Sequence, residues 1–266
     1  MMRRSSTHLV TRLAALGALG LLASGVAACG TADNRSVSSP AAAPAQQATT
    51  TATATTVASA STLPGESIDN GPAAGAVLAV VGVPFDDVLE VRSAPGDDQD
   101  VVTSLEPLAD DVVATGRARL LASSGWFEVT ANGTTGWANA AFLAYLGDTT
   151  DTTSAVVAAL GGIPTATSML ELGGIVAGTA ASVDEPSSRV TVAVAPSERA
   201  DLGEVTYDVV GLPDDSIYGV RLQVFGTPTD ADLPRSALLR ATTFALKTVE
   251  TTTLCRRGVT DDRLCI

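Results

Sequence analysis

Histidine chemistry is confined to the start of this sequence. The chain has 266 residues and one histidine, His8. His8 lies in an N-terminal segment that we expect to be removed, so the mature chain would carry no imidazole. Serine–histidine–aspartate and cysteine–histidine catalysis need an imidazole base, and zinc sites commonly use imidazole ligands. We therefore predict a chain that is not an enzyme, with no metal site and no cofactor.

Adjacent aspartates are the other groups that could do chemistry. The candidate carboxylate pairs are Asp97-Asp98, Asp110-Asp111 and Asp214-Asp215. A glycosidase needs two carboxyl groups that face each other across about 5–9.5 Å, and neighbours in a turn do not do so. A calcium loop at Asp214-Asp215 stays open as an alternative, although EF-hand spacing is absent. The favoured interpretation is solvated acids in turns, so we predict no catalytic residue.

Cys29 follows a segment with the features of an export signal. Arg3, Arg4 and Arg12 precede an apolar run over 13–28 that ends in small residues. A basic start, a short apolar stretch and a small-residue end are typical of a secretory signal peptide. The run is shorter than the ~20 residues that a transmembrane helix needs. We predict a signal peptide over 1–28.

The residues Val26-Ala27-Ala28-Cys29 resemble the bacterial lipobox. In that family the cysteine is diacylated and becomes the new N-terminus. The resemblance implies lipidation of Cys29, a lipid bilayer as partner, and a place at the extracytoplasmic face of the cell membrane. Buried acyl chains contribute about 0.8 kcal/mol per methylene to such an anchor. The alternative is an ordinary cleaved signal followed by a chance cysteine.

Two further cysteines, Cys255 and Cys265, form an even pair once Cys29 is acylated. Exported proteins fold in an oxidising environment, where paired cysteines become disulfides. We predict a disulfide that closes a small C-terminal loop.

The overall charge is strongly acidic, with 16 Lys and Arg against 29 Asp and Glu and a formal net charge of −13. Proteins that bind nucleic acid need a basic patch, so we predict no nucleic-acid partner.

Residues 29–75 form a low-complexity stretch. They are rich in Ala, Thr, Ser and Pro and contain no aromatic residue. Such a stretch buries too little apolar surface to offset the entropy of ordering. We predict a disordered linker, with order beginning near Ala76.

A polar run at 148–151 divides the remaining chain into two predicted domains, 76–148 and 149–266. In the first domain, short apolar runs alternate with turn residues. Asn132-Gly133, between runs at 126–130 and 135–138, predicts a hairpin because both residues accept positive φ. Short strands at this spacing predict a small all-β barrel.

Two motifs in this first domain carry a family resemblance. They consist of Leu89, Val91, Arg92, Pro95 and Gly96, and of Trp126, Val129, Gly133, Gly136, Trp137, Phe142 and Leu143. The residues resemble the bacterial SH3-like (SH3b) family, which implies a non-catalytic barrel that binds cell-wall peptides.

Arg92, Trp126 and Trp137 are the ligand-binding residues that we infer for this domain. A guanidinium holds a carboxylate with two parallel donors, and indole rings stack on peptide or sugar. The competing interpretations are core packing for both tryptophans and pairing of Arg92 with Asp86, Asp87 or Glu90.

The second domain, 149–266, predicts two short helices followed by antiparallel strands. One helix ends at Gly161-Gly162, and Ser168 with Glu171 has the capping-box spacing of a second helix that runs through Ala180. Alternating apolar residues then predict four strands, at 190–194, 205–209, 220–224 and 244–246. This order predicts an α+β domain. Its C-terminal part loosely resembles an actinobacterial envelope module of unknown role.

The predicted fold class is therefore multi-domain: a disordered linker, a small all-β SH3-like barrel and an α+β domain with helices before an antiparallel sheet. The predicted function is a non-catalytic, membrane-tethered lipoprotein that presents its SH3-like module to peptidoglycan peptides. The alternative is an envelope protein–protein adaptor or inhibitor that acts through the C-terminal α+β domain.

We predict that Cys29→Ser releases the protein from membranes, because the substitution removes the only atom that could carry the acyl chains. Membrane and soluble fractions of expressing cells, probed for the full chain, provide the measurement. Unchanged retention in the membrane fraction would contradict lipidation at this residue.

Overall fold

A computed structural model describes residues 63–183, 187–199, 201–229 and 243–266. The predicted signal peptide, Cys29 and the linker up to residue 62 lie outside the described residues. The last part of the predicted linker lies inside them, and it packs on the first strands. Glu66 and Ser67 pair with Leu120 and Arg119, and the amide of Gly75 donates to the carbonyl of Ala114 at 2.8 Å. The prediction that order begins only near Ala76 is therefore corrected.

The N-terminal strands form one antiparallel path. Along the sheet they pair in the order β2-β5-β6-β7-β3-β4, and β1 pairs with β5. Alternate residues point into a shared core that includes Val80, Val91 and Val129. The strands are β1 (Glu66–Ser67), β2 (Val77–Val80), β3 (Leu89–Arg92), β4 (Val101–Leu105), β5 (Val112–Leu120), β6 (Gly125–Ala131) and β7 (Thr134–Asn139).

The predicted hairpin at Asn132-Gly133 is confirmed. Strands β6 and β7 pair residue by residue from Ala131–Thr134 to Trp126–Asn139. Asn132 has a φ of 51° and Gly133 a φ of 74°, so both turn residues adopt the left-handed conformation that their types tolerate.

The chain continues through a short 3-10 helix, η1 (Ala140–Phe142), into a long strand that belongs to both halves of the sheet. This strand is β8 (Leu143–Asp151). Its first residues, Leu143 and Ala144, pair with β2, and its later residues pair with β13. The hydroxyls of Thr149 and Thr252 lie 2.7 Å apart across the β8–β13 pair.

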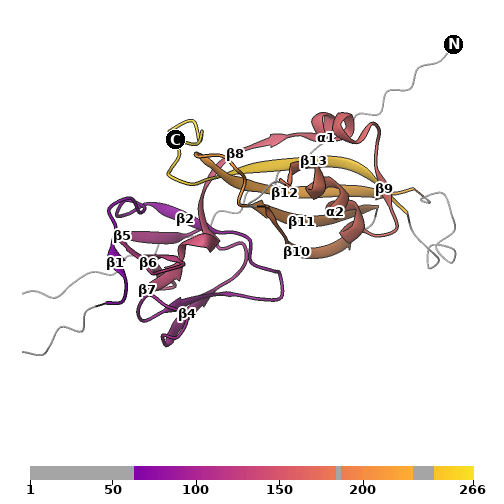
Figure 1. The fold of residues 1–266 in the computed structure, drawn as a ribbon. Coiled ribbons are helices and arrows are strands. Elements are labelled where there is room, and N and C mark those ends of the chain that lie inside the picture. Colours follow the sequence, from indigo (N-terminus) through magenta and orange to yellow (C-terminus); the bar gives the residue numbers. More distant parts are fainter. Residues whose placement is uncertain (1–62, 184–186, 200, 230–242) are drawn as a thin grey trace, which may run out of the picture. The chain divides into compact units, whose positions relative to one another are not determined.

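The C-terminal elements complete the same sheet, whose order from one edge is β10-β11-β12-β13-β8-β2 (Figure 1). Two α-helices lie against strands β10–β13, and their apolar side chains share a core with alternate residues of those strands. The elements are α1 (Thr153–Leu160), β9 (Thr165–Ala166), α2 (Met169–Ala180), β10 (Arg189–Arg199), β11 (Leu202–Val210), β12 (Ile217–Pro228) and β13 (Phe244–Cys255).

The predicted fold class is wrong. The described residues are mostly β, and their strands join into one antiparallel sheet of 13 strands rather than a separate barrel and a separate α+β domain. The polar run at 148–151, read from the sequence as a boundary, is the end of β8 and pairs with β13. The sheet already contains β8 before α1 begins, and β9 enters it between the two helices. Among the described residues, α1 and α2 are therefore not followed by a separate sheet, as the predicted α+β domain required.

The local signals for both helices are nevertheless confirmed. Gly161 ends α1 with a φ of 72°. The Ser168 hydroxyl accepts a hydrogen bond from the amide of Glu171 at 3.1 Å, at the start of α2. The Glu171 carboxylate reaches back to the amide and hydroxyl of Thr167, and these bonds lower its pKa.

Gly173 allows α2 to lie close to the sheet. A Cβ at this position would come within 2.5 Å of the Tyr207 ring and 2.6 Å of Val205. Gly178, on the same helix, has no atom within 4 Å of the equivalent point. Packing against the sheet therefore requires glycine at position 173 but not at position 178.

We predict opposite effects of alanine at these two glycines. Gly173→Ala should lower the free energy of unfolding by about 1–3 kcal/mol, because it overpacks the helix–sheet contact. Gly178→Ala should leave it unchanged or raise it by up to ~1 kcal/mol through helix propensity. Chemical denaturation of both variants provides the measurement, and equal midpoints would contradict the close approach at Gly173.

Candidate functional site

The two tryptophans expected to bind a ligand are core residues. Trp126 is 1% exposed and Trp137 is 2% exposed. The indole nitrogen of Trp126 donates to the Ser124 hydroxyl at 2.9 Å, and the Arg117 guanidinium lies 5.4 Å from the Trp137 ring centre. Neither ring presents a half-exposed face for stacking, so the packing interpretation describes both.

Arg92 is already engaged by the protein. Its guanidinium forms an ion pair with Glu90 and donates to the carbonyl of Gln99 at 2.6 Å. In the sheet, Arg92 pairs with Trp137. We expected this guanidinium to bind a ligand carboxylate. It is instead neutralised by Glu90, one of the competing partners named above.

Arg92 and Trp126 nevertheless meet at one pocket, which we call the Arg92 pocket. It has a volume of about 310 Å³ and three carboxylates in its wall against one guanidinium. Its lining residues are Asp87, Val88, Leu89, Glu90, Arg92, Asp97, Trp126, Asn139 and Phe142. Trp137 is not among them, so the structure brings together two of the three predicted ligand residues.

The adjacent aspartates are turn acids in the part of the chain that is described. The Asp214 carboxylate accepts hydrogen bonds from the amides of Ile217 at 2.6 Å and Ser216 at 2.8 Å. These backbone bonds lower the pKa of Asp214, with smaller contributions from the Ser216 hydroxyl and the charge of Arg256. The neighbouring Asp215 faces solvent, 3.8 Å from Arg257. The two carboxylates thus serve different partners and do not face each other across a substrate.

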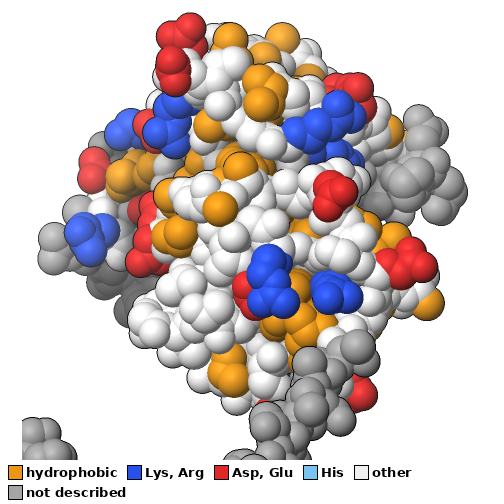
Figure 2. All heavy atoms as spheres, turned by 90° about the vertical axis from the view of Figure 1, so that its left-hand side faces the viewer, with side chains coloured by type: hydrophobic (Ala, Val, Ile, Leu, Met, Phe, Trp, Pro, Cys, Tyr) orange, Lys and Arg blue, Asp and Glu red, His pale blue; other side chains and the backbone are white. Residues whose placement is uncertain are grey.

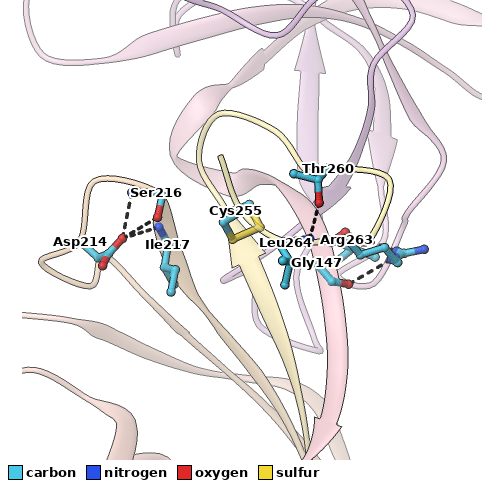
Figure 3. The surroundings of a disulfide bond; sticks show 10 residues. Gly147, Asp214, Ser216, Ile217, Cys255, Thr260, Arg263 and Leu264 are labelled. Atoms are coloured by element: carbon cyan, nitrogen blue, oxygen red, sulfur yellow. Dashed lines mark hydrogen bonds between the residues drawn. A yellow bond between two sulfur atoms is a disulfide. The ribbon is translucent and has the colours of Figure 1, made fainter.

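The predicted disulfide between Cys255 and Cys265 is present, with a Cα–Cα distance of 5.2 Å. The loop that it closes fastens onto β8 (Figure 3). Arg263 donates to the carbonyls of Gly147 at 3.2 Å and Leu146 at 3.3 Å, and its own carbonyl accepts from the amide of Asp148 at 3.0 Å. The sequence predicted the bond but not this contact.

A buried ion pair joins the C-terminal strands to the end of β2, and the sequence analysis did not predict it. Asp208 is fully buried, and Arg221 donates to its two carboxylate oxygens at 2.7 and 2.8 Å. Arg221 also donates to the carbonyl of Val80, and Asp208 accepts from the amide of Gly82, both at 2.8 Å. Asp208 and Arg221 are directly paired in the β11–β12 register. The sequence analysis predicted both strands but not their register, and only the register reveals that these opposite charges are paired.

A small apolar cluster also connects the two halves of the sheet. Val81, Ala144, Val210 and Leu254 form a small buried cluster, which we call the junction. It contains residues from before and after η1, so the two halves of the sheet share a core.

A second pocket lies beside the junction, and we call it the junction pocket. It has a volume of about 390 Å³ and is lined by Phe127, Ala140, Ala141, Leu143, Tyr218 and Arg256. The Tyr218 hydroxyl donates to the carbonyl of Ala141 at 2.7 Å, and Arg256 lies 4.9 Å above the Tyr218 ring. The pocket thus has mostly apolar walls and one cation.

The described part of the chain shows neither a membrane-spanning helix nor a metal cluster. None of its helices has the length and apolarity needed to cross a bilayer. Within the same residues, no three His, Cys, Asp or Glu side chains gather closely enough to hold a metal ion. On the face drawn in Figure 2, acidic and basic side chains are interspersed, and no single charged patch dominates.

Comparison of the chain with protein-family models, with curated proteins and with solved structures finds no match.

We predict that Asp208→Asn lowers the free energy of unfolding by about 3–5 kcal/mol, because it leaves the Arg221 charge buried without a counter-charge. The matched control is Asp215→Asn, which removes the partner of an exposed arginine and should leave the denaturation midpoint unchanged, since exposed ion pairs contribute little. Equal midpoints for the two variants would show that the buried ion pair contributes no more to the free energy of unfolding than the exposed one.

Proposed function

We propose that this chain is a non-catalytic lipoprotein of the cell envelope that binds peptidoglycan peptide at the Arg92 pocket. The observation that carries the proposal is the meeting of Arg92 and Trp126, two residues of the SH3b-like motifs, at one pocket. The resemblance of Cys29 to a lipobox cysteine supports the lipid tether, and the disulfide supports export to an oxidising compartment.

The chemistry of the pocket suits a peptide that carries amino groups. Three acids, Asp87, Glu90 and Asp97, share the wall with a guanidinium that already pairs with one of them. The pocket therefore has an excess of negative charge, which favours a ligand ammonium group over a carboxylate. The Asn139 side chain adds an amide, the Oδ1 of which accepts from Ala141. Wall peptides offer ammonium groups and backbone amides together.

Asp214 and Glu90 are engaged in ways that favour a non-catalytic chain. Asp214 accepts bonds from its own turn, and Glu90 neutralises Arg92. A general acid–base pair needs carboxyl groups placed on either side of a reacting bond. These acids instead hold the protein's own groups in place.

The test is sedimentation of the purified full chain with isolated sacculi. We expect the wild type to pellet with sacculi and the double variant Asp87→Asn/Asp97→Asn to bind about tenfold more weakly, because two charge-assisted contacts are removed. The matched control is Asp261→Asn/Asp262→Asn, which removes the same charge from exposed positions outside the pocket.

Each outcome bears on the proposal in a different way. Wild-type protein that stays in the supernatant would reject wall binding and favour an envelope adaptor. Equal binding by both double variants would reject the Arg92 pocket as the site.

A further inference from the structure

The junction pocket has the composition of a small-molecule site. Ligand pockets commonly occupy 300–1,000 Å³, have mainly apolar walls and carry a few fixed polar groups. The junction pocket has about 390 Å³, two aromatic rings from Phe127 and Tyr218, and aliphatic walls. Its rings come from β6 and β12, which belong to opposite halves of the sheet. A ligand here would touch both halves.

Arg256 is held at this wall by neutral groups. Its Nε donates to the carbonyl of Asp214 and its Nη2 to the carbonyl of Leu212, each at 3.0 Å. Its guanidinium stacks over the Tyr218 ring, which the bond to the Ala141 carbonyl fixes in turn. The side chain is therefore positioned before any ligand arrives, which reduces the entropy lost on binding.

The charge of Arg256 is not neutralised by an ion pair within the described ranges. The four ion pairs found there involve Arg92, Arg117, Arg221 and Arg257. The charge of Arg256 makes a small contribution to the lowered pKa of Asp214, but the Oδ1 of Asp214 already accepts hydrogen bonds from Ser216 and Ile217. No hydrogen bond from Arg256 Nη1 to another described residue is present. The guanidinium thus retains donors for an external anion.

Among the described residues that line this pocket, Arg256 alone is charged. In a chain with a formal net charge of −13, a pocket with a lone cation and no acid is an unusual local environment. A second arginine lies nearby: Arg189 stacks 4.6 Å from the Phe142 ring centre and donates to the Ala141 carbonyl at 3.2 Å. The local field therefore favours an anion, in contrast to the Arg92 pocket.

We propose that the junction pocket binds a compact organic carboxylate with an apolar, preferably aromatic, body. The carboxylate would accept hydrogen bonds from the Arg256 guanidinium, and the body would lie between Phe127 and Tyr218. The proposal concerns a different pocket and the opposite charge from the wall-peptide site, and it does not depend on that site.

The test uses the purified full chain and probes that differ in charge. The probes are 3-phenylpropionate, its neutral amide and 3-phenylpropylamine, titrated by ligand-observed NMR. We expect saturable binding of the acid, with a dissociation constant of roughly 1 mM or below, and at least about tenfold weaker binding of the amide and the amine. A tetrapeptide with a C-terminal phenylalanine carboxylate tests whether the acid can be a chain end, and its C-terminal amide is the control.

Variants locate the site. Arg256→Gln should weaken binding of the acid at least about tenfold, and Arg256→Lys should restore part of it. The matched control is Arg257→Gln, which removes the same charge from the adjacent residue, itself paired with Asp215. Ala141→Leu, which fills the pocket without touching the guanidinium, should abolish binding even if the Arg256 variants prove unstable.

Three outcomes would overturn the proposal: no saturable binding of either acid, equal affinity for acid and amide, or an equal loss in Arg257→Gln and Arg256→Gln. Binding of the peptide acid but not of 3-phenylpropionate would support a chain end as the ligand, and the reverse would support a free small acid. Sedimentation with sacculi should be unaffected by Arg256→Gln, so failure here and failure of wall binding are distinguishable.

Discussion

The pairing of Asp208 with Arg221 is the contact on which the arrangement of the described residues depends. The ion pair lies in the β11–β12 pair, and its two side chains also bond to Val80, the last residue of β2, and to Gly82, just after β2. Burial of two charges is costly unless geometry and hydrogen bonds are good, and here each group has more than one partner. A contact of this kind tolerates little relative movement, so the two halves of the sheet behave as one unit.

That unit explains where the two pockets lie. The Arg92 pocket is built mainly from β3 and the segments around it, whereas the junction pocket needs residues from both halves. Their charges are opposite: acids outnumber the guanidinium in the first, and a lone guanidinium marks the second. The two pockets are neighbours, because consecutive residues line them: Trp126 lines the first and Phe127 the second, and Phe142 lines the first and Leu143 the second.

Local signals in the sequence were sufficient for individual elements. Asn132-Gly133 predicted its hairpin, Ser168 its helix start, and the cysteine pair its disulfide, because each depends on residues close together in the chain. The fold class was not predictable in this way. Partners of β8 lie about 100 residues away in β13, and polar threonines there satisfy one another across strands, so the stretch looked like a boundary. The burial of Trp126 and Trp137 likewise follows from tertiary packing that no local pattern records.

The double pairing of β8 also has a consequence for the order in which the protein can mature. A chain that is synthesised from its N-terminus presents β2 to β8 first and β13 later. The edge of β8 that pairs with β13 therefore stays unpaired until β13 and the disulfide loop that carries Arg263 are available. Pairings of such long sequence separation form slowly and leave strand edges exposed meanwhile. Completion of the sheet thus depends on β13, although the strand that it must join, β8, is made about 100 residues earlier.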